Sequence, residues 1–366
     1  MGDGITGYLL EQRASFREAP LSDVDSLVFS TIAYFNFEAG ELGNTVPSEL
    51  VPLPVAVCGI AHHNLYGDIW LERMGGDEFL SALLASPRFM DVKVGYYVNE
   101  VSNHFEKQFS AVSFFLPTDE VYVAYRGTDN TIAGWKEDFN LTHTRELPSH
   151  VSARSYLEDI ADLGASRLFV GGHSKGGNLA EYAVLTCREN TFAKVARVFN
   201  HDGPGFVFPP SERIDSAEYV AKLDKTVPGS SVFGMLMETR DRIRIVQSSG
   251  VLFLQHASTH WAVEDGSFVE LANLSPEAEI VTNVLNSWKD LYDNDKRELF
   301  IDAVFEVLWA ADADTWSEFS QHPAETARAI AEATIKLPPD MRATIVSMIG
   351  DIAPILASEV TKRVHF

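Results

Sequence analysis

Hydrophobic residues recur with two different periods along the chain, and the change of period divides it into three parts. After Ser22, a residue type that caps helices, apolar side chains recur at every third or fourth position. From about residue 92 the pattern changes to short runs rich in Val, Phe and Tyr, and after Ser275 the helical spacing returns. We therefore predict a helical N-terminal region over 1–90 that packs on the core, an α/β core over 91–274 and a helical C-terminal region over 275–366.

The middle part alternates predicted strands with predicted helices. Such alternation is typical of an α/β fold in which a mostly parallel sheet is flanked by helices. A predicted helix, SARSYLEDIADLG, precedes the strand SRLFVGG, and a second helix over residues 176–188 follows it. The other predicted strands are VKVGYYV, FSAVSFFL, VYVAYRG and KVARVFN, with RIRIVQSS and SFVEL near the end of the core.

Composition and charge exclude several classes of function. The formal net charge of −23 disfavours nucleic acid and anionic membrane surfaces as partners, because both repel a strongly negative protein. Two cysteines give no disulfide framework, so we expect a reducing compartment. The N-terminus lacks the pattern of a signal peptide, and we expect no transmembrane segment, reading TIVSMIGDIAPILASEV as a packing helix. These features favour a cytoplasmic protein.

The segment LFVGGHSKGGNLA carries the main chemical signal. It contains the G-x-S-x-G pattern, with Ser174 between Gly172 and Gly176, after a strand and before a helix. A nucleophile on so sharp a turn needs glycines on both sides, because a Cβ atom there would clash with neighbouring backbone. The helix that follows directs its N-terminal amides at the site where an oxyanion forms. Ser174 is therefore the predicted nucleophile.

About fifty residues upstream stands VYVAYRGTDNTIAGWKEDFNL, and with it the chain resembles the class 3 lipases of the α/β-hydrolase superfamily. The segments GHSKGGNLAEYA, NHDGPGF and QHASTHW also resemble a largely bacterial branch of lipase-like hydrolases. The resemblance implies an α/β-hydrolase fold with oxyanion-hole amides from Thr128 and Lys175. Arg126 is expected to form a structural ion pair with Asp138. Lys175 departs from the apolar residue usual in class 3 lipases, which suggests a polar or anionic acyl substrate, or a side chain that reaches solvent.

A serine nucleophile needs a histidine as base and an acid that orients the histidine. In α/β-hydrolases both follow the serine along the chain, acid first. His256 is the preferred base because the lipase-like branch shows Gln-His before a Trp, and His260 is the alternative. Asp202, in the turn HDGPGF after a strand, is the preferred acid. Asp224 is the alternative because it precedes a Val-Pro pair, as the acid of class 3 lipases does.

The expected function is hydrolysis of a carboxylic ester, with a small-molecule or lipid acyl ester as substrate. The apolar segment VFGMLM, residues 232–237, is expected to serve core packing, with an acyl pocket as the alternative. No cofactor is implied, and no metal, because the adjacent His62 and His63 do not face one site. Acyl transfer or thioester cleavage by the same residues remains open, as does a non-catalytic interaction protein that keeps the fold. The oligomeric state stays unknown.

Overall fold

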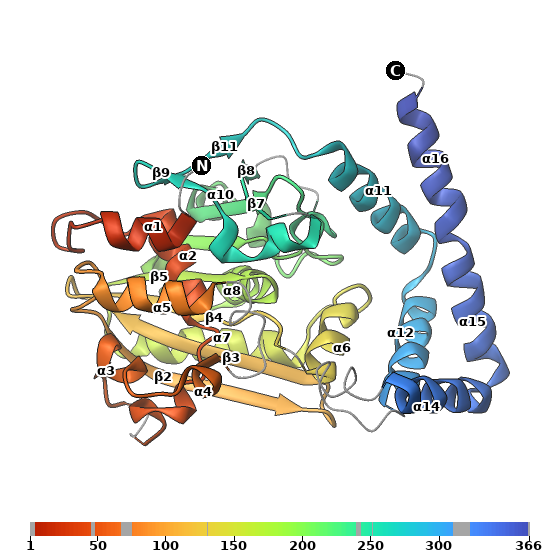
Figure 1. The fold of residues 1–366 in the computed structure, drawn as a ribbon, viewed down its shortest axis with the longest axis horizontal. Coiled ribbons are helices and arrows are strands. Elements are labelled where there is room, and N and C mark those ends of the chain that lie inside the picture. Colours follow the sequence, from red (N-terminus) through yellow and green to blue (C-terminus); the bar gives the residue numbers. More distant parts are fainter. Residues whose placement is uncertain are drawn as a thin grey trace.

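The computed structural model describes residues 4–44, 48–66, 75–129, 131–238, 243–250, 252–309 and 323–364. Its centre is a nine-stranded sheet within those residues, in the order β1-β2-β3-β4-β5-β6-β7-β8-β11 (Figure 1). The strands are β1 (Val51–Pro52), β2 (Lys93–Ser102), β3 (Lys107–Phe115), β4 (Glu120–Tyr125), β5 (Arg167–His173), β6 (Val195–His201), β7 (Leu223–Pro228), β8 (Arg244–Val246) and β11 (Glu270–Leu271). A short hairpin of β9 (Val263–Glu264) and β10 (Ser267–Phe268) lies outside this sheet.

The centre of the sheet is parallel, as the alternation of strands and helices predicts. Strands β4 to β8 all run in one direction, and a helical crossover separates β4 from β5 and β5 from β6. Strands β1 to β4 instead pair antiparallel, because short turns join β2, β3 and β4 and leave no length for a crossover. The result is a mixed α/β fold with a large central sheet flanked by helices.

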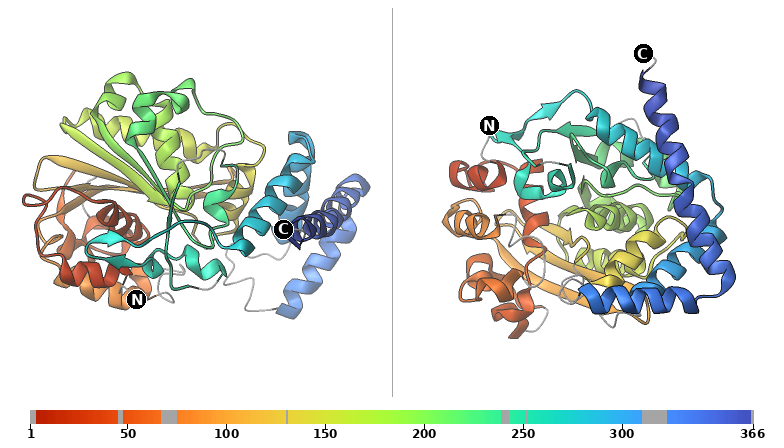
Figure 2. Two further views of the ribbon diagram at one scale, coloured as in Figure 1. Left: turned by 90° about the horizontal axis from the view of Figure 1, so that it is seen from above. Right: turned by 45° about the vertical axis from the view of Figure 1, so that its right-hand side comes forward.

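Helices cover both faces of the sheet (Figure 2). On one face, α2 packs against β4, β5 and β6, and on the other α7 and α8 pack against β3, β4, β5 and β6. The helices before the C-terminal region are α1 (Gly4–Glu11), α2 (Asp23–Ile32), α3 (Leu53–Val57), α4 (His62–Tyr66), α5 (Gly76–Ala85), α6 (Ile132–Asn140), α7 (Pro148–Asp162), α8 (Lys175–Thr186), α9 (Glu189–Lys194) and α10 (Ala217–Lys222).

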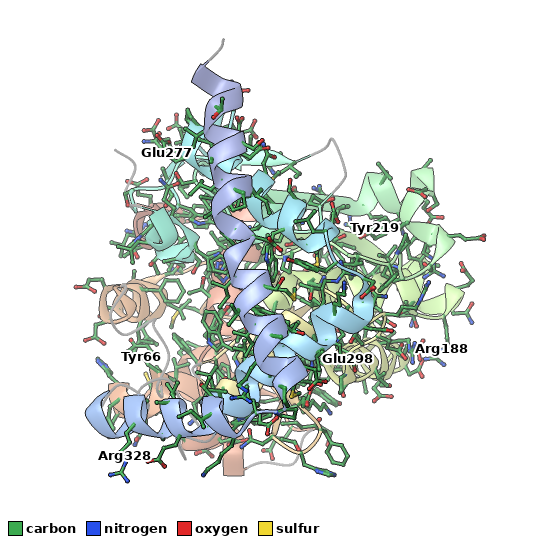
Figure 3. All side chains as sticks on the ribbon, turned by 90° about the vertical axis from the view of Figure 1, so that its right-hand side faces the viewer. Tyr66, Arg188, Tyr219, Glu277, Glu298 and Arg328 are labelled. Carbon is green, nitrogen blue, oxygen red and sulfur yellow. The ribbon has the colours of Figure 1, made fainter. Side chains whose placement is uncertain are left out.

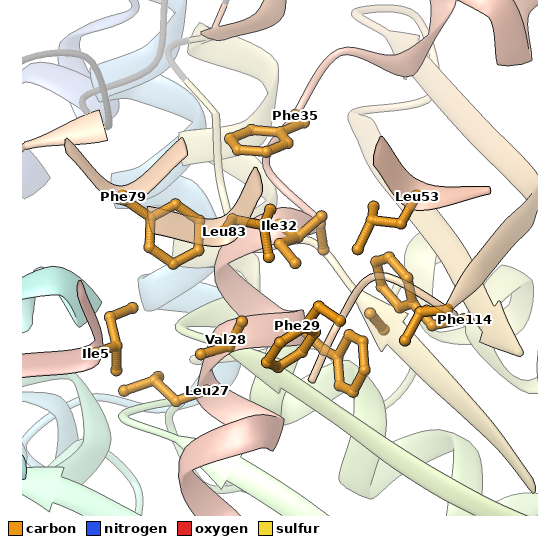
Figure 4. Close-up of a cluster of buried hydrophobic side chains, with 14 of the residues drawn as sticks. Ile5, Leu27, Val28, Phe29, Ile32, Phe35, Leu53, Phe79, Leu83 and Phe114 are labelled. Atoms are coloured by element: carbon orange, nitrogen blue, oxygen red, sulfur yellow. The ribbon is translucent and has the colours of Figure 1, made fainter. Parts of the chain in front are cut away.

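Helix α2 begins where the sequence predicts. Ser22 caps it by accepting a hydrogen bond from the backbone N–H of Asp25, and the Asp25 carboxylate accepts one from the backbone N–H of Ser22. The side chain of Phe29 then packs between helix and sheet, with its ring centroid 4.7 Å from that of Phe114 (Figure 4). Asp25 also forms a fully buried ion pair with Arg88, 2.6 Å between oxygen and nitrogen. The N-terminal region is thereby fixed to the sheet.

The Pro-rich stretch over residues 48–57 contains regular secondary structure. It holds β1, which pairs with the edge strand β2, and the short helix α3. Pro52 is compatible with this position because an edge strand does not need every backbone N–H for pairing. The edge position therefore explains a strand that proline content alone argues against.

The C-terminal helices form a layer at the side of the α/β core (Figure 1). Helix α12 packs against α6, α14 and α15, and α16 packs against α11. Figure 3 looks onto this layer, and the side chain of Arg328 extends outward from α14. Its helices are α11 (Pro276–Asp290), α12 (Asn294–Trp309), α14 (Pro323–Lys336), α15 (Pro339–Gly350) and α16 (Ile352–Val364).

Among the described residues, one helical stretch has the length and composition to cross a bilayer. It is Pro339–Thr361, 23 residues long, and only 11% of its most apolar window is buried. The expectation that no stretch has spanning length was therefore wrong, whereas the expected packing helix is found, because α15 packs against α12 and α16 packs against α11. The stretch is nevertheless anchored through polar contacts, because Trp288 donates to the Met348 carbonyl at 2.6 Å and Tyr292 donates to Asp351.

Candidate active site

The turn between β5 and α8 presents Ser174 at the carboxyl end of the central parallel strands. Ser174 has φ 59° and ψ −134°, a strained conformation for a residue other than glycine. Cβ atoms built at Gly172 and Gly176 would lie 2.3 Å and 2.1 Å from backbone atoms of Gly176 and Tyr125. Only glycine fits at both positions, so the spacing in the sequence follows from the close approach of β4, β5 and α8.

The loop after β4 packs against this turn. A Cβ atom on Gly127 would lie 2.6 Å from the His173 carbonyl oxygen and 3.1 Å from the Ser174 Cβ atom. Thr128, the next residue, is therefore adjacent to the nucleophile turn, and Lys175 follows Ser174 directly. The Thr128 hydroxyl donates a hydrogen bond to Asp138 on α6, so this side chain holds the loop in place.

The side chain of Asp202 contacts His256. Asp202 follows β6 and is fully buried, and His256 lies in the loop after β8. His256 Nδ1 donates a hydrogen bond to Asp202 Oδ2 at 2.6 Å, which leaves Nε2 as the nitrogen that accepts a proton. The other carboxylate oxygen accepts hydrogen bonds from the Ser231 hydroxyl and, at 3.1 Å, from the Gly234 backbone N–H. Asp202 is thus fixed on both of its oxygens.

Two alternative residues lie in other surroundings. Asp224 stands at the start of β7, where it forms ion pairs with Arg197 at 2.7 Å and with Arg244 at 3.1 Å. In the parallel register Asp224 lies level with Phe199 and Gly171, so it stands three residues before Ser174 along the strand direction and its carboxylate is held by the two arginines. His260 Nδ1 donates to the Leu254 carbonyl at 3.1 Å, as expected of a histidine that orders its own loop. The geometry favours Asp202 and His256 over both alternatives.

His173 has a positioning role that the sequence did not indicate. Its Nε2 donates to the His256 carbonyl at 2.7 Å, and the Tyr34 hydroxyl donates to its Nδ1 at 3.0 Å. The two imidazole centroids are 4.5 Å apart. Burial holds the pKa of His173 well below its usual range, and the neighbouring His256 lowers the pKa further. A neutral His173 therefore connects the nucleophile turn to the backbone of His256.

The side chain of Lys175 does not reach solvent. It is 1% exposed, and its ammonium donates to Glu137 at 2.7 Å and to Gln108 at 3.0 Å. The expectation that Lys175 reaches solvent was therefore wrong, because α6 supplies a buried carboxylate directly beside it. Arg126 likewise pairs with Asp129 at 2.9 Å, and the expected ion pair with Asp138 is not formed. Asp129 is only three residues from Arg126 in the chain, and its carboxylate lies close enough to pair with the guanidinium.

A pocket of about 270 Å³ opens beside Ser174. Most of its lining is apolar, and it comes mainly from four places far apart in the sequence. One side is the nucleophile turn, a second is the segment 232–237, the third consists of helices α11 and α12 of the C-terminal layer, and the fourth is α6 with the residues that follow it. The apolar side chains from the second and third places are Val232, Phe233, Leu236, Met237, Leu285, Trp288, Phe300 and Ile301. Segment 232–237 thus forms pocket wall, where core packing was expected.

Asp138 lies between the pocket and the loop after β4. Burial raises its pKa to about 6, against the lowering effects of the Lys175 charge and of the hydrogen bond from Thr128. In the unfolded chain an aspartate titrates near 4. The folded state therefore binds the Asp138 proton more tightly, and the stability that this group contributes is lost as the pH rises from about 4 through 6.

Asp138→Asn is accordingly expected to gain stability relative to the natural protein as the pH rises. Between pH 4.5 and 7 the difference in free energy of unfolding should change by about 1–2 kcal/mol in favour of the variant. Urea denaturation at four pH values in this interval measures the change. The exposed Asp265→Asn variant controls for net charge, and an Asp138→Asn difference that does not vary with pH would contradict the expectation.

No group of three or more potential metal ligands occurs among the residues that the structure describes. His62 forms an exposed contact with Asp77, 2.8 Å between Nδ1 and the carboxylate.

Comparison with known proteins identifies one family. Residues 83–306, more than half of the chain, match the model of the Mbeg1-like family, and no curated protein matches the chain. The match overturns the resemblance to class 3 lipases as a family assignment. The G-x-S-x-G turn and the loop after β4 did not identify the family, because their glycines follow from the geometry of a tight turn that unrelated families share.

Proposed function

The chain belongs to the Mbeg1-like family, which is lipase-like, and from this premise we propose that it is a serine hydrolase that cleaves a carboxylic ester. The observation that carries the proposal is the hydrogen bond of 2.6 Å between His256 Nδ1 and Asp202 Oδ2, formed beside the strained turn of Ser174. A buried carboxylate that fixes one imidazole nitrogen leaves the other free to take a proton from a serine. The chain order of serine, acid and histidine supports an α/β-hydrolase fold.

In this mechanism Ser174 attacks the ester carbonyl while His256 Nε2 accepts its proton. Within the described residues the Ser174 hydroxyl makes no hydrogen bond, so it is available for such a contact when substrate binds. The backbone amides of Thr128 and Lys175 would stabilise the oxyanion, and each would lower the activation barrier by about 3 kcal/mol. His256 then protonates the leaving alcohol, and the acyl group stays on Ser174 as an ester. Water attacks this acyl-enzyme while His256 accepts a proton from the water, and His256 returns the proton to Ser174 as the acid leaves.

The apolar lining of the pocket supports an acyl ester as substrate, either a small molecule or a lipid. Thioester cleavage and acyl transfer would use the same residues, and a panel of esters, thioesters and acceptor alcohols separates these reactions. The proposal needs no metal or cofactor for any step. The proposed location is the cytoplasm, where the two cysteines, both free thiols in the structure, would stay reduced.

Labelling by a fluorophosphonate probe tests the proposal. The natural protein should react covalently at Ser174, because the probe traps a serine activated by a histidine. Ser174→Ala should not react, while Ser230→Ala keeps the nucleophile and the contacts of Asp202, because the Ser230 hydroxyl donates to Ser275, and it controls for labelling of another hydroxyl. Peptide mass spectrometry identifies the labelled residue. If the natural protein is not labelled, or Ser174→Ala is labelled to the same extent, the protein is not a serine hydrolase and the non-catalytic alternative stands.

A further inference from the structure

Arg297 is one of several polar residues in the mostly apolar lining of the pocket, which also includes Asp138 and Lys289. It lies in the first turn of α12, is 7% exposed and contributes to the pocket wall that also contains Ser174. Ser174 comes from the turn before α8, so the pocket brings the nucleophile and a buried cation into one cavity. A cation at this depth requires an explanation, because removing a charge from water costs several kcal/mol unless another charge compensates it.

The contacts of Arg297 do not compensate its charge. Nη1 donates to the Lys289 carbonyl at 2.9 Å, and Nη2 donates to the Asn294 side-chain oxygen. Both acceptors are neutral, and Nε is buried without any hydrogen-bond partner in the described part of the chain. No described carboxylate comes within 4.0 Å of the Arg297 guanidinium, the limit for an ion pair. Burial lowers the pKa of Arg297, and the carboxylates of Asp290 and Asp293 offset only part of this lowering.

The Arg297 guanidinium keeps one unused N–H on each of Nη1 and Nη2, and a planar anionic group matches such a pair of donors. Arginine binds carboxylates and phosphates through two parallel N–H donors, and such bonds strengthen in a site that excludes water. The remainder of the pocket offers mostly apolar side chains, which suit a hydrocarbon chain. Lys289, the other lysine or arginine of α11 and α12 in the wall, is already paired with Asp290, so Arg297 is the one of these two whose charge has no paired carboxylate among the described residues.

We propose that Arg297 binds an anionic oxygen group on the substrate, so that the pocket accepts an ester whose hydrocarbon part carries a carboxylate or a phosphate. The inference rests on the proposed hydrolase function and adds the chemical class of the substrate. A competing explanation is purely structural: the guanidinium donates to a carbonyl in the last turn of α11, where a cation is favourable. The two explanations predict different behaviour toward charged and neutral esters.

Steady-state kinetics with two matched nitrophenyl esters distinguish them. One ester has a neutral six-carbon acyl chain, and the other has a chain of the same length that ends in a carboxylate. The natural protein should favour the anionic ester in kcat/KM, and Arg297→Gln should lower kcat/KM for that ester by about 10- to 100-fold, as expected for lost hydrogen bonds to a charged group. The neutral ester should change by less than about 3-fold, since it makes no such bonds.

Two further variants keep the test decisive. Arg328→Gln makes the same substitution on exposed α14 and should change neither ester. Arg297→Lys retains the charge but loses the planar donor pair, and it should still reduce the preference for the anionic ester several-fold. It also serves if Arg297→Gln does not fold. Equal losses for both esters, or an unchanged preference in both Arg297 variants, would assign Arg297 to the structural role and overturn the inference.

A binding measurement separates this inference from the hydrolase proposal. Calorimetric titration of Ser174→Ala protein uses hexyl phosphate, hexanoate and hexanol as probes, and the two anions also distinguish a phosphate from a carboxylate. Tighter binding of an anion than of hexanol should disappear when Arg297→Gln is added. If that preference is present but no ester is cleaved, the anion site stands and the hydrolase proposal fails. If esters are cleaved but the preference is absent, this inference fails.

Discussion

Replacing Asp202 with asparagine is expected to lower kcat for ester hydrolysis by about 10⁴-fold while the fold is retained. The asparagine amide cannot hold His256 in the tautomer that leaves Nε2 unprotonated, and it cannot stabilise the imidazolium that forms when Ser174 attacks. In the natural protein the Asp202 carboxylate accepts a hydrogen bond from the N–H of His256 Nδ1, at 2.6 Å. Nitrophenyl ester hydrolysis, measured with urea denaturation of the same samples, gives activity and stability together.

Asp224→Asn is the matched control for this effect. Asp224 pairs with Arg197 and Arg244, whereas Asp202 contacts His256, so the loss of Asp224 should reduce stability but change kcat by less than about 3-fold. The reverse outcome, with a large loss of kcat in Asp224→Asn and a small one in Asp202→Asn, would assign the acid to Asp224.

Glu137→Gln is expected to destabilise the protein by about 3–5 kcal/mol, because it removes the close counter-charge of the buried Lys175 ammonium and leaves only Asp138, at 3.9 Å. Glu137 is fully buried, and it also accepts hydrogen bonds from the backbone N–H groups of Gln108, at 2.9 Å, and Ser149, at 3.0 Å. The midpoint of urea denaturation should therefore fall markedly. Adding Lys175→Met should recover part of the loss, since it removes the uncompensated charge.

The same substitution on an exposed ion pair provides the comparison. Glu332 pairs with Arg328 at 2.8 Å on α14, with both side chains largely in water, and Glu332→Gln should leave the midpoint of urea denaturation almost unchanged. A loss of stability at Glu137 as small as that at Glu332 would show that the Lys175 ammonium gains solvent when its partner is removed. The double variant would then offer no recovery.

Local sequence patterns predicted the elements that build the site. The cap at Ser22 fixes where α2 begins, and the glycines around Ser174 predict a strand, a tight turn and a helix in that order. These predictions succeed because each depends on contacts between residues only a few positions apart: a side chain with the next turn of its own helix, or a Cβ atom with nearby backbone. The helix start at Ser275 succeeds for the same reason.

The sequence patterns did not predict the contacts between distant segments. A side chain that reaches solvent was one expectation for Lys175, yet a carboxylate on α6 holds it in the interior. Arg126 pairs with a different aspartate from the one expected, and segment 232–237 forms pocket wall. None of these outcomes has a local signal, because a charged or apolar residue is compatible with several partners until the chain folds.

The sequence by itself therefore determined the alternation of strands and helices, the glycine-bounded turn at Ser174 and a short choice of acids and bases. Only the tertiary structure decided that Asp202 lies against His256 while Asp224 lies among arginines, and that the C-terminal helices form a wall of the pocket. The physical reason is the range of the interactions. Helix caps and tight turns depend on neighbours in the chain, whereas a buried carboxylate and the imidazole it orients are 54 residues apart and meet only when β6 and the loop after β8 reach the same edge of the sheet.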